Sequence, residues 1–158
     1  MSFAWGSTSL ARLELADADL QRWAHAWLAE SPNDLRIETS TRGKAAQAAK
    51  VAAGNSRAAF GSSPHNYAPA LALDIEPLIV HPSTGKLVVP WKEWDGSEIR
   101  REGGGAVSQI WRDHGARGLA VAKRLGIALT WGGHFRSLYD CPHFERTDWR
   151  ERRGKLAP

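Results

Sequence analysis

Cys141 is the only cysteine in this chain of 158 residues, and this single thiol constrains the possible folds more than any other feature. One thiol cannot form a disulfide within the chain, so a hydrophobic core has to hold the fold together. Hydrophobic residues make up 42% of the chain and charged residues 24%, which excludes a disordered tail. No long linker separates two cores. The sequence therefore predicts a single domain over residues 1–158.

The charge and hydropathy of the chain exclude several partners. The formal net charge of +4 is too small to indicate nucleic acid. Five basic and two acidic residues fall in the segment 146–158, which we expect to be a solvated, basic C-terminal tail. No apolar run approaches the roughly 18 residues that a membrane span needs. The N-terminus also lacks the apolar stretch flanked by positive charge that marks a secretory signal. We therefore expect no membrane span and no signal peptide.

Hydrophobic periodicity predicts helices that alternate with short strands. Residues 17–30 place Leu20, Trp23 and Trp27 on one face at helical spacing, with Asp17 as the N-cap. The other expected elements are helices over 43–53 and 106–125, strands over 35–40, 71–75, 127–131 and 142–145, a hairpin from 78–80 to 87–89, and an irregular segment over 91–105. This order indicates an α+β fold with a small antiparallel sheet and packed helices.

Polar residues that could carry chemistry cluster in two segments far apart in the sequence. Two imidazoles and one carboxylate form a common ligand set for a catalytic zinc ion, with a fourth position left open for water. His65, Asp74 and His143 would supply that set. Asp140, three residues before His143, could then act as the carboxylate that transfers a proton. The spacing permits this metal site without being diagnostic of it.

Simpler roles stay open for the same residues. Asp74 could point to solvent from its strand, His65 could be a surface residue in a polar loop, and His143 could be a hydrogen-bonded core residue. Cys141 could be a nucleophile with His143 or His134 as its base, although no orienting third group marks it.

The remaining histidines have structural interpretations. His114 falls on the apolar face of the helix predicted over 106–125, so we expect it to be buried or half-buried. His25 lies off the apolar face of its helix and His81 sits at a hairpin end, so we expect both to be exposed.

The motifs taken together resemble those of a known family. Along the chain the sequence reads Ser63-x-His65, Ala72-x-Asp74, Trp131-Gly132-Gly133 and Asp140-x-x-His143-Phe144-Glu145. This combination is similar to the zinc D,D-carboxypeptidase and L-alanyl-D-glutamate endopeptidase family, whose members cut the stem peptides of bacterial peptidoglycan. The resemblance spans roughly residues 10 to 146 and is strongest to the single-domain endolysins of bacteriophages.

The resemblance implies a role for each matching residue. It implies zinc ligation by His65, Asp74 and His143, and a catalytic carboxylate at Asp140. Arg42, which lies five residues before Gln47 as in the family's strand-to-helix segment, would bind substrate or the developing oxyanion. Ser63 would be a further residue at the substrate site. The implied fold is the small α+β fold shared with hedgehog signalling domains.

The resemblance also implies a biological setting. The chain would be a monomeric zinc endolysin that hydrolyses the L-alanyl-D-glutamate bond of stem peptides. It would be made in the host cytoplasm, which suits a single unpaired cysteine, and would act on the wall, in the periplasm, after a separate protein opens the membrane. The alternatives are a D-Ala-D-Ala carboxypeptidase of the same family, a cell-wall-binding module without catalysis, and a non-haem iron oxygenase, because two histidines and one carboxylate also suit Fe(II).

Two features depart from the family pattern. The step from His65 to Asp74 is nine residues, with Pro69 inside it, where many members have a step of seven. His134 follows two glycines at a position where Asp is common in similar sequences. We therefore expect a longer loop before Asp74, and His134 is either an extra group of the site or a residue on its rim.

Overall fold

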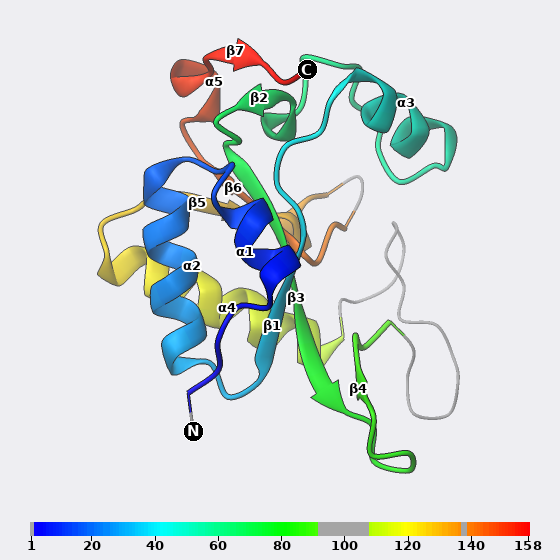
Figure 1. Ribbon diagram of the computed structural model, residues 1–158, viewed down its shortest axis with the longest axis vertical. Helices are drawn as coiled ribbons and strands as arrows, with labels where there is room; N and C mark the ends of the chain where they lie inside the picture. Colours follow the sequence, from blue (N-terminus) through cyan, green and yellow to red (C-terminus); the bar gives the residue numbers. More distant parts are fainter. Residues whose placement is uncertain (1, 92–107, 137–138) are drawn as a thin grey trace.

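A five-stranded antiparallel sheet lies at the centre of the fold, which the computed structural model describes for residues 2–91, 108–136 and 139–158 (Figure 1). The strand order is β1-β3-β6-β5, and β4 pairs with the end of β3. The strands span Asp34–Thr39 (β1), Ala72–Val80 (β3), Leu87–Val88 (β4), Leu129–Trp131 (β5) and His143–Arg146 (β6). The expected α+β fold with a small antiparallel sheet is therefore confirmed.

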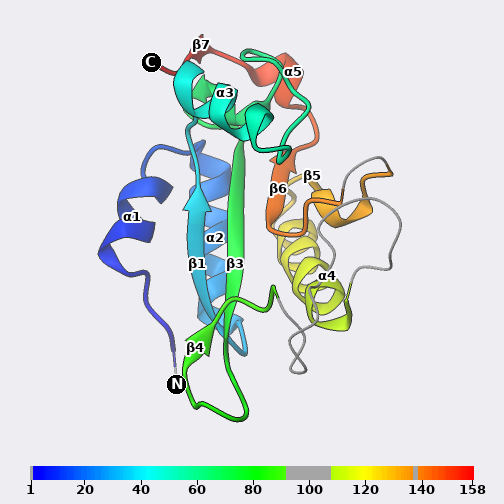
Figure 2. The ribbon, with the colours of Figure 1, turned by 90° about the vertical axis from the view of Figure 1, so that its right-hand side faces the viewer.

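Two long helices cover one face of this sheet. α2 (Ala18–Glu30) and α4 (Gln109–Arg124) contact each other, and in Figure 2 α2 lies behind β1 and β3 while α4 lies below β6. The apolar face predicted for α2 is buried, and the Asp17 side chain accepts a hydrogen bond from the Asp19 backbone N–H at 3.0 Å. α1 (Ser7–Leu13) packs beside β1. The sheet is thus apolar on its helical side.

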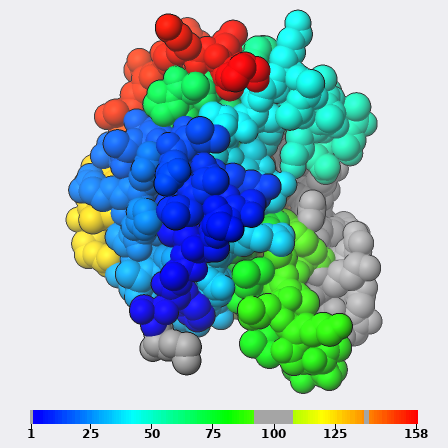
Figure 3. Space-filling model, in the orientation of Figure 1, coloured from blue at the N-terminus to red at the C-terminus, as the bar shows by residue number. Residues whose placement is uncertain are grey.

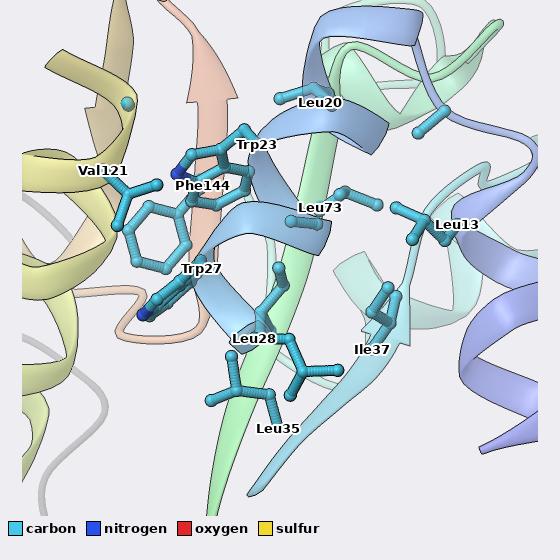
Figure 4. Packing of buried hydrophobic residues seen from close by; sticks show 14 of the residues in the cluster. Leu13, Leu20, Trp23, Trp27, Leu28, Leu35, Ile37, Leu73, Val121 and Phe144 are labelled. Atoms are coloured by element: carbon cyan, nitrogen blue, oxygen red, sulfur yellow. The ribbon is translucent and has the colours of Figure 1, made fainter. Parts of the chain in front are cut away.

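The core between the helices and the sheet is rich in aromatic rings. The Phe144 ring of β6 lies 5.1 Å from the ring centroids of both Trp23 and Trp27 (Figure 4). Val121 of α4 and Leu73 of β3 belong to the same buried cluster. Large aromatic groups bury much apolar area, so this cluster fixes β6 firmly against β3 and α2.

Shorter elements gather at one end of the sheet. They are α3 (Lys44–Ala52), the 3-10 helix η1 (Pro64–Asn66), β2 (Tyr67–Ala68), α5 (Trp149–Arg152) and β7 (Lys155–Leu156). β2 and β7 pair antiparallel, with Tyr67 opposite Leu156. Figure 3 shows the C-terminal residues, in red, seated against these green and cyan segments.

The C-terminal segment differs from the solvated tail that we expected for 146–158. Arg146 and Trp149 are both 4% exposed. Arg146 is buried because its guanidinium pairs with Asp19 at 2.6 Å and with Asp148 at 3.0 Å. Trp149 is buried because it packs with Tyr67. The other basic residues of the segment are exposed, namely Arg150, Arg152, Arg153 and Lys155.

Other boundaries also differ from the predictions. The expected strands 71–75 and 78–80 are one strand, β3, which continues through Pro77 and forms the expected hairpin with β4. The helix expected from residue 106 begins at Gln109 after the N-cap Ser108, whose side chain accepts from the Trp111 N–H. Nearly all of the irregular segment 91–105 lies outside the described residues. Within the part of the chain that is described, no helix has the length and apolar character needed to span a bilayer.

Candidate active site

The alternation of side chains along β3 separates the core from a polar face. Leu73 and Ile75 point to the helical side and belong to the hydrophobic core. Asp74 and Glu76, between and after them, line a cleft on the other side. Successive residues of a strand face opposite sides of its sheet, so this one strand supplies both core and site. Asp74 is buried in the wall of the cleft and does not project freely into solvent.

Three side chains from different elements converge at the bottom of the cleft. The Asp74 Oδ1 atom lies 3.0 Å from His65 Nε2 and 3.0 Å from His143 Nδ1, and the two nitrogens lie 3.1 Å apart. The β3–β6 pairing places Asp74 directly opposite His143. His65 comes from η1, 78 residues before His143. The structure thus brings together the three residues that the sequence proposed as metal ligands.

The donor set fits a tetrahedral zinc ion. With metal–ligand bonds of about 2.0–2.1 Å, the ligand atoms of a tetrahedral site lie about 3.3 Å apart. The observed separations of 3.0–3.1 Å require only a small expansion. Two imidazole nitrogens and one carboxylate oxygen leave further coordination positions on the cleft side.

A backbone carbonyl fixes the orientation of the His65 ring. Its Nδ1 atom donates a hydrogen bond to the Ser40 backbone carbonyl at 2.6 Å, which orients the ring with Nε2 3.0 Å from Asp74 Oδ1. The Ser63 side chain accepts from the His65 backbone N–H at 3.4 Å and caps η1. Ser63, expected at the substrate site, lines the cleft and also holds His65 in place.

His143 has a carboxylate partner that the sequence reasoning missed as a functional residue. Its Nε2 atom lies 2.8 Å from Glu145 Oε2, on the side of the ring away from Asp74. A carboxylate in this position orients a metal-binding imidazole and raises its basicity. The available signal was the two-residue spacing, since residues two apart in a strand share a face.

The charges at the bottom of the cleft shift several pKa values. Burial alone would raise the pKa of the Asp74 carboxyl, but the charges of His65 and His143 and their hydrogen bonds hold it well below its ordinary value. Burial alone would lower the pKa of His143, but hydrogen bonds to Asp74 and Glu145 raise it to about 10. The cluster therefore favours cations, which is the electrostatic requirement of a metal site.

Asp140 lies beside this cluster in the wall of the cleft. Burial and the negative charge of Asp74 raise the pKa of its carboxyl. Its backbone N–H donates to the Gly132 carbonyl at 3.0 Å, and its carbonyl accepts from the His143 N–H at 3.1 Å. A Cβ atom at Gly132 would overlap the Asp140 carbonyl oxygen. Gly132 therefore allows the Asp140 turn to approach closely, and Gly133 leaves room for the Trp131 ring.

Arg42 is buried beside the same cluster and lines the cleft. Its Nη2 atom lies 3.4 Å from Asp74 Oδ2, and its Nη1 atom donates to Gln47 Oε1 at 3.1 Å. Among the described residues its Nε atom has no hydrogen-bond partner, although the atom is buried. Arg42 thus adds positive charge within reach of Asp74 and retains one unsatisfied donor.

The histidines outside the cluster match their structural interpretations except for His81, which was expected to be exposed. His114 is buried and donates its Nε2 hydrogen to the Ile75 carbonyl at 2.9 Å. His25 is exposed, whereas His81 is partly covered. His134 is exposed and packs edge-on against Trp131, with ring centroids 4.9 Å apart, which is a rim position. Cys141 is part of the hydrophobic core, 1% exposed.

The cleft has a volume of about 730 Å³ and is large enough for a peptide. Its walls come from β1, α3, the loop after α3, η1, β3, the loop before β6, β6 and α5. The cleft therefore combines a buried cluster of ligand-type donors, a neighbouring carboxylate with a raised pKa, and charged walls. A hydrolytic metal site would require these features.

Comparisons with known proteins identify the class. A family model described as D-alanyl-D-alanine carboxypeptidase matches residues 56–146, and the chain belongs to this peptidase family. The matched segment contains His65, Asp74, Asp140 and His143.

A solved structure extends the similarity to nearly the whole chain. The crystal structure of the Serratia marcescens L-Ala D-Glu endopeptidase ChiX is 25% identical in sequence, with a TM-score of 0.66 over 96% of this chain and 93% of that one. A search of curated proteins found no match.

Proposed function

We propose that this protein is a zinc-dependent peptidoglycan hydrolase that cleaves the L-alanyl-D-glutamate bond of cell-wall stem peptides. The observation that carries the proposal is the convergence of His65 Nε2, Asp74 Oδ1 and His143 Nδ1 within 3.0–3.1 Å at the bottom of a peptide-sized cleft. The likeness to an L-Ala D-Glu endopeptidase over 96% of the chain supports the choice of bond.

Zinc is the metal that the donor set favours. His65, Asp74 and His143 would hold it, and Ser40 and Glu145 would orient the two imidazoles. When bound, zinc supplies a Lewis acid that polarises a carbonyl and lowers the pKa of water toward about 7.

Asp140 is the proposed general base. Its side chain lines the same cleft as the three ligands, and the raised pKa of its carboxyl suits a group that accepts and then releases a proton. In the ionised form, Asp140 would take a proton from the attacking water. It would then return this proton to the leaving amine of the D-glutamyl residue.

Arg42 and Ser63 are the proposed substrate-side groups. The Arg42 guanidinium, buried beside Asp74, would offset negative charge that develops on the scissile carbonyl oxygen. Ser63 lines the cleft next to His65 and offers a hydroxyl to the peptide. Both groups are held rigidly, Arg42 by Gln47 and Ser63 by η1, so little reorganisation is needed when substrate binds.

A second bond is favoured by the family description. The matching family model is described as a D-alanyl-D-alanine carboxypeptidase, so release of terminal D-alanine is the alternative activity. The resemblance of the sequence motifs to the single-domain endolysins of bacteriophages favours the endolysin assignment instead. In that setting the protein would act as a bacteriolytic monomer on the wall in the periplasm, once a separate protein has opened the host membrane.

One experiment tests both metal and bond. Purified protein is analysed for bound metals, stripped with EDTA and given back zinc or iron, and each form is incubated with purified cell walls. We expect one zinc per chain, loss of activity on stripping and recovery with zinc. Mass spectrometry of the products should show new D-glutamyl amino termini. Released D-alanine would identify the carboxypeptidase, and activity that survives metal removal would contradict the zinc mechanism.

A further inference from the structure

The C-terminal segment contributes an aromatic and cationic pair to the cleft, outside the stretch that defines the family. The family match ends at residue 146. Trp149 and Arg150 follow it in α5 and line the same cleft as His65 and His143. The Arg150 guanidinium carbon lies over the Trp149 ring, 4.4 Å from its centroid. This geometry is that of a cation–π contact, which holds a cation in a preferred orientation.

The Trp149 ring is a rigid support for this cation. Trp149 is buried and packs with Tyr67 and Leu71 in a small hydrophobic cluster. Its ring lies 6.2 Å from that of Tyr67, which is two residues after His65. Asp148, directly before it, accepts from Arg146 Nε at 3.0 Å and from Arg152 Nε at 2.7 Å. Arg150 is therefore held on the same framework as the candidate metal ligands.

Most other cations of the cleft already have carboxylate partners. Arg42 pairs with Asp74 at 3.4 Å, Arg36 with Glu76 at 2.9 Å between Nε and Oε2, and Lys50 with Glu38 at 3.9 Å. Within the described ranges, no carboxylate lies within 4.0 Å of Arg150 or of Arg57. Of these two, Arg150 is the one that an aromatic face orients.

The proposed substrate carries a negative charge close to the scissile bond. Glutamate has two carboxyl groups, and only one of them continues the peptide beyond the L-alanyl-D-glutamyl linkage. The other stays free as a carboxylate on the residue that supplies the leaving amine. An arginine with a fixed plane can bind such a carboxylate with two parallel hydrogen bonds.

We propose that Arg150, held on Trp149, is a specificity-determining residue that binds the free carboxylate of the glutamyl residue. This inference rests on the proposed function, since it assigns a subsite to that same reaction. Arg150 acts on binding and not on the chemical step, because its partner is a substituent that is not transformed. Its loss should therefore raise KM and leave kcat nearly unchanged.

The test compares two synthetic peptides that differ in one group. One contains the L-alanyl-D-glutamyl bond with a free glutamyl carboxylate, and the other has a carboxamide in its place. Zinc-loaded wild-type protein should cleave the free acid with a KM about tenfold lower. Arg150→Gln should raise the KM for the free acid about tenfold, which is the low end for a charge-assisted hydrogen bond because Arg150 is exposed. The same variant should leave cleavage of the carboxamide unchanged.

Matched variants separate a specific contact from general charge. Arg153→Gln removes the same charge from the end of the same helix, outside the lining of the cleft, and should discriminate like wild type. Arg150→Lys keeps the charge without the planar fork and should recover only part of the preference. High salt should reduce the wild-type preference and leave Arg150→Gln unaffected.

The outcomes distinguish this inference from the proposed function. If Arg150→Gln loses activity equally on both peptides, or if it still prefers the free acid, the carboxylate subsite is not at Arg150. If wild-type protein cleaves neither peptide but releases D-alanine from walls, the proposed bond is wrong and the inference falls with it.

Discussion

Two buried histidines lie on opposite faces of the sheet, His114 in the core and His143 in the cleft, and they differ in the charge that their surroundings favour. His114 and His143 are both 5% exposed. His114 sits among aromatic rings, and within the described ranges its hydrogen-bond acceptor is the Ile75 carbonyl. Burial therefore lowers its pKa from 6.5 to about 3. The carboxylates around His143 overcome burial and raise its pKa to about 10. Neighbouring charge, and not burial, distinguishes the candidate site from the core.

The largest change should come from the carboxylate that completes the site. Asp140→Asn keeps the size of the side chain but cannot accept a proton. We expect turnover of cell walls to fall about a thousandfold, within the usual range for a general base, while zinc content stays at the wild-type level. Asp113→Asn, an exposed carboxylate on α4, is the control and should have normal turnover. Normal turnover in Asp140→Asn would remove Asp140 from the mechanism.

The next effect concerns the carboxylate that makes His143 unlike His114. Glu145→Gln removes the negative charge of the carboxylate that lies against His143 Nε2. We expect zinc affinity, measured by competition with a chelator, to fall about 10–100-fold, as for other carboxylates that orient a metal-binding histidine. Glu38→Gln makes the same change elsewhere in the cleft and should leave affinity unchanged. Equal affinities in the two variants would show that Glu145 has no part in orienting the ligand.

A smaller effect, on stability, should come from His114. Below about pH 6.5 the unfolded chain binds a proton at this histidine, whereas the folded protein does not until about pH 3. The stability that depends on neutral His114 is therefore complete above pH 6.5 and is lost as the pH falls, by about 1.4 kcal/mol per pH unit. His114→Gln keeps a donor for the Ile75 carbonyl and should have a flatter dependence in urea unfolding between pH 6 and pH 4.

The exposed residue His25 provides the control for the His114 variant. His25→Gln changes an exposed histidine of α2 and should leave the pH dependence of unfolding as in wild type. If His114→Gln and wild type lost stability in parallel as the pH fell, His114 would have to be protonated in the folded protein.

The smallest effect should come from the exposed histidine on the rim. His134 contacts the Trp131 ring and does not line the cleft. His134→Ala should change the free energy of unfolding by less than about 0.5 kcal/mol and cell-wall turnover by less than about twofold. A large loss of turnover with unchanged stability would instead place His134 in the substrate path.

The parts of the fold with strong local signals could be predicted from the sequence. α2 was predicted from its apolar face and its Asp17 cap. α1, α5 and the β2–β7 pair were not predicted, because such short elements depend on tertiary contacts. β3 was divided at Pro77, since proline cannot donate in a ladder. In the structure Pro77 lies between the parts of β3 that pair with β6 and with β4.

The sequence predicted the site residues whose side chains carry a recognisable chemistry, including Asp140, Arg42 and Ser63, but not the groups that support them. His65, Asp74 and His143 were proposed from residue type and resemblance, and the structure brings them together. The Ser40 carbonyl could not be found, because any residue type offers a backbone carbonyl. The cleft position of Trp149 and Arg150 depends on how the C-terminal segment folds back along β2, which its charge pattern did not reveal.

The cross-strand pairing of Asp74 with His143 makes the alignment of β3 and β6 a condition for binding metal. A slip of one residue between these strands would place an apolar neighbour, Leu73 or Phe144, at the ligand position. Only chains with the native alignment could then bind the proposed zinc ion. Binding would draw the population toward that alignment, since a ligand stabilises the state that binds it. The amount of zinc bound during refolding would therefore measure the fraction of chains in which β3 and β6 have the native alignment.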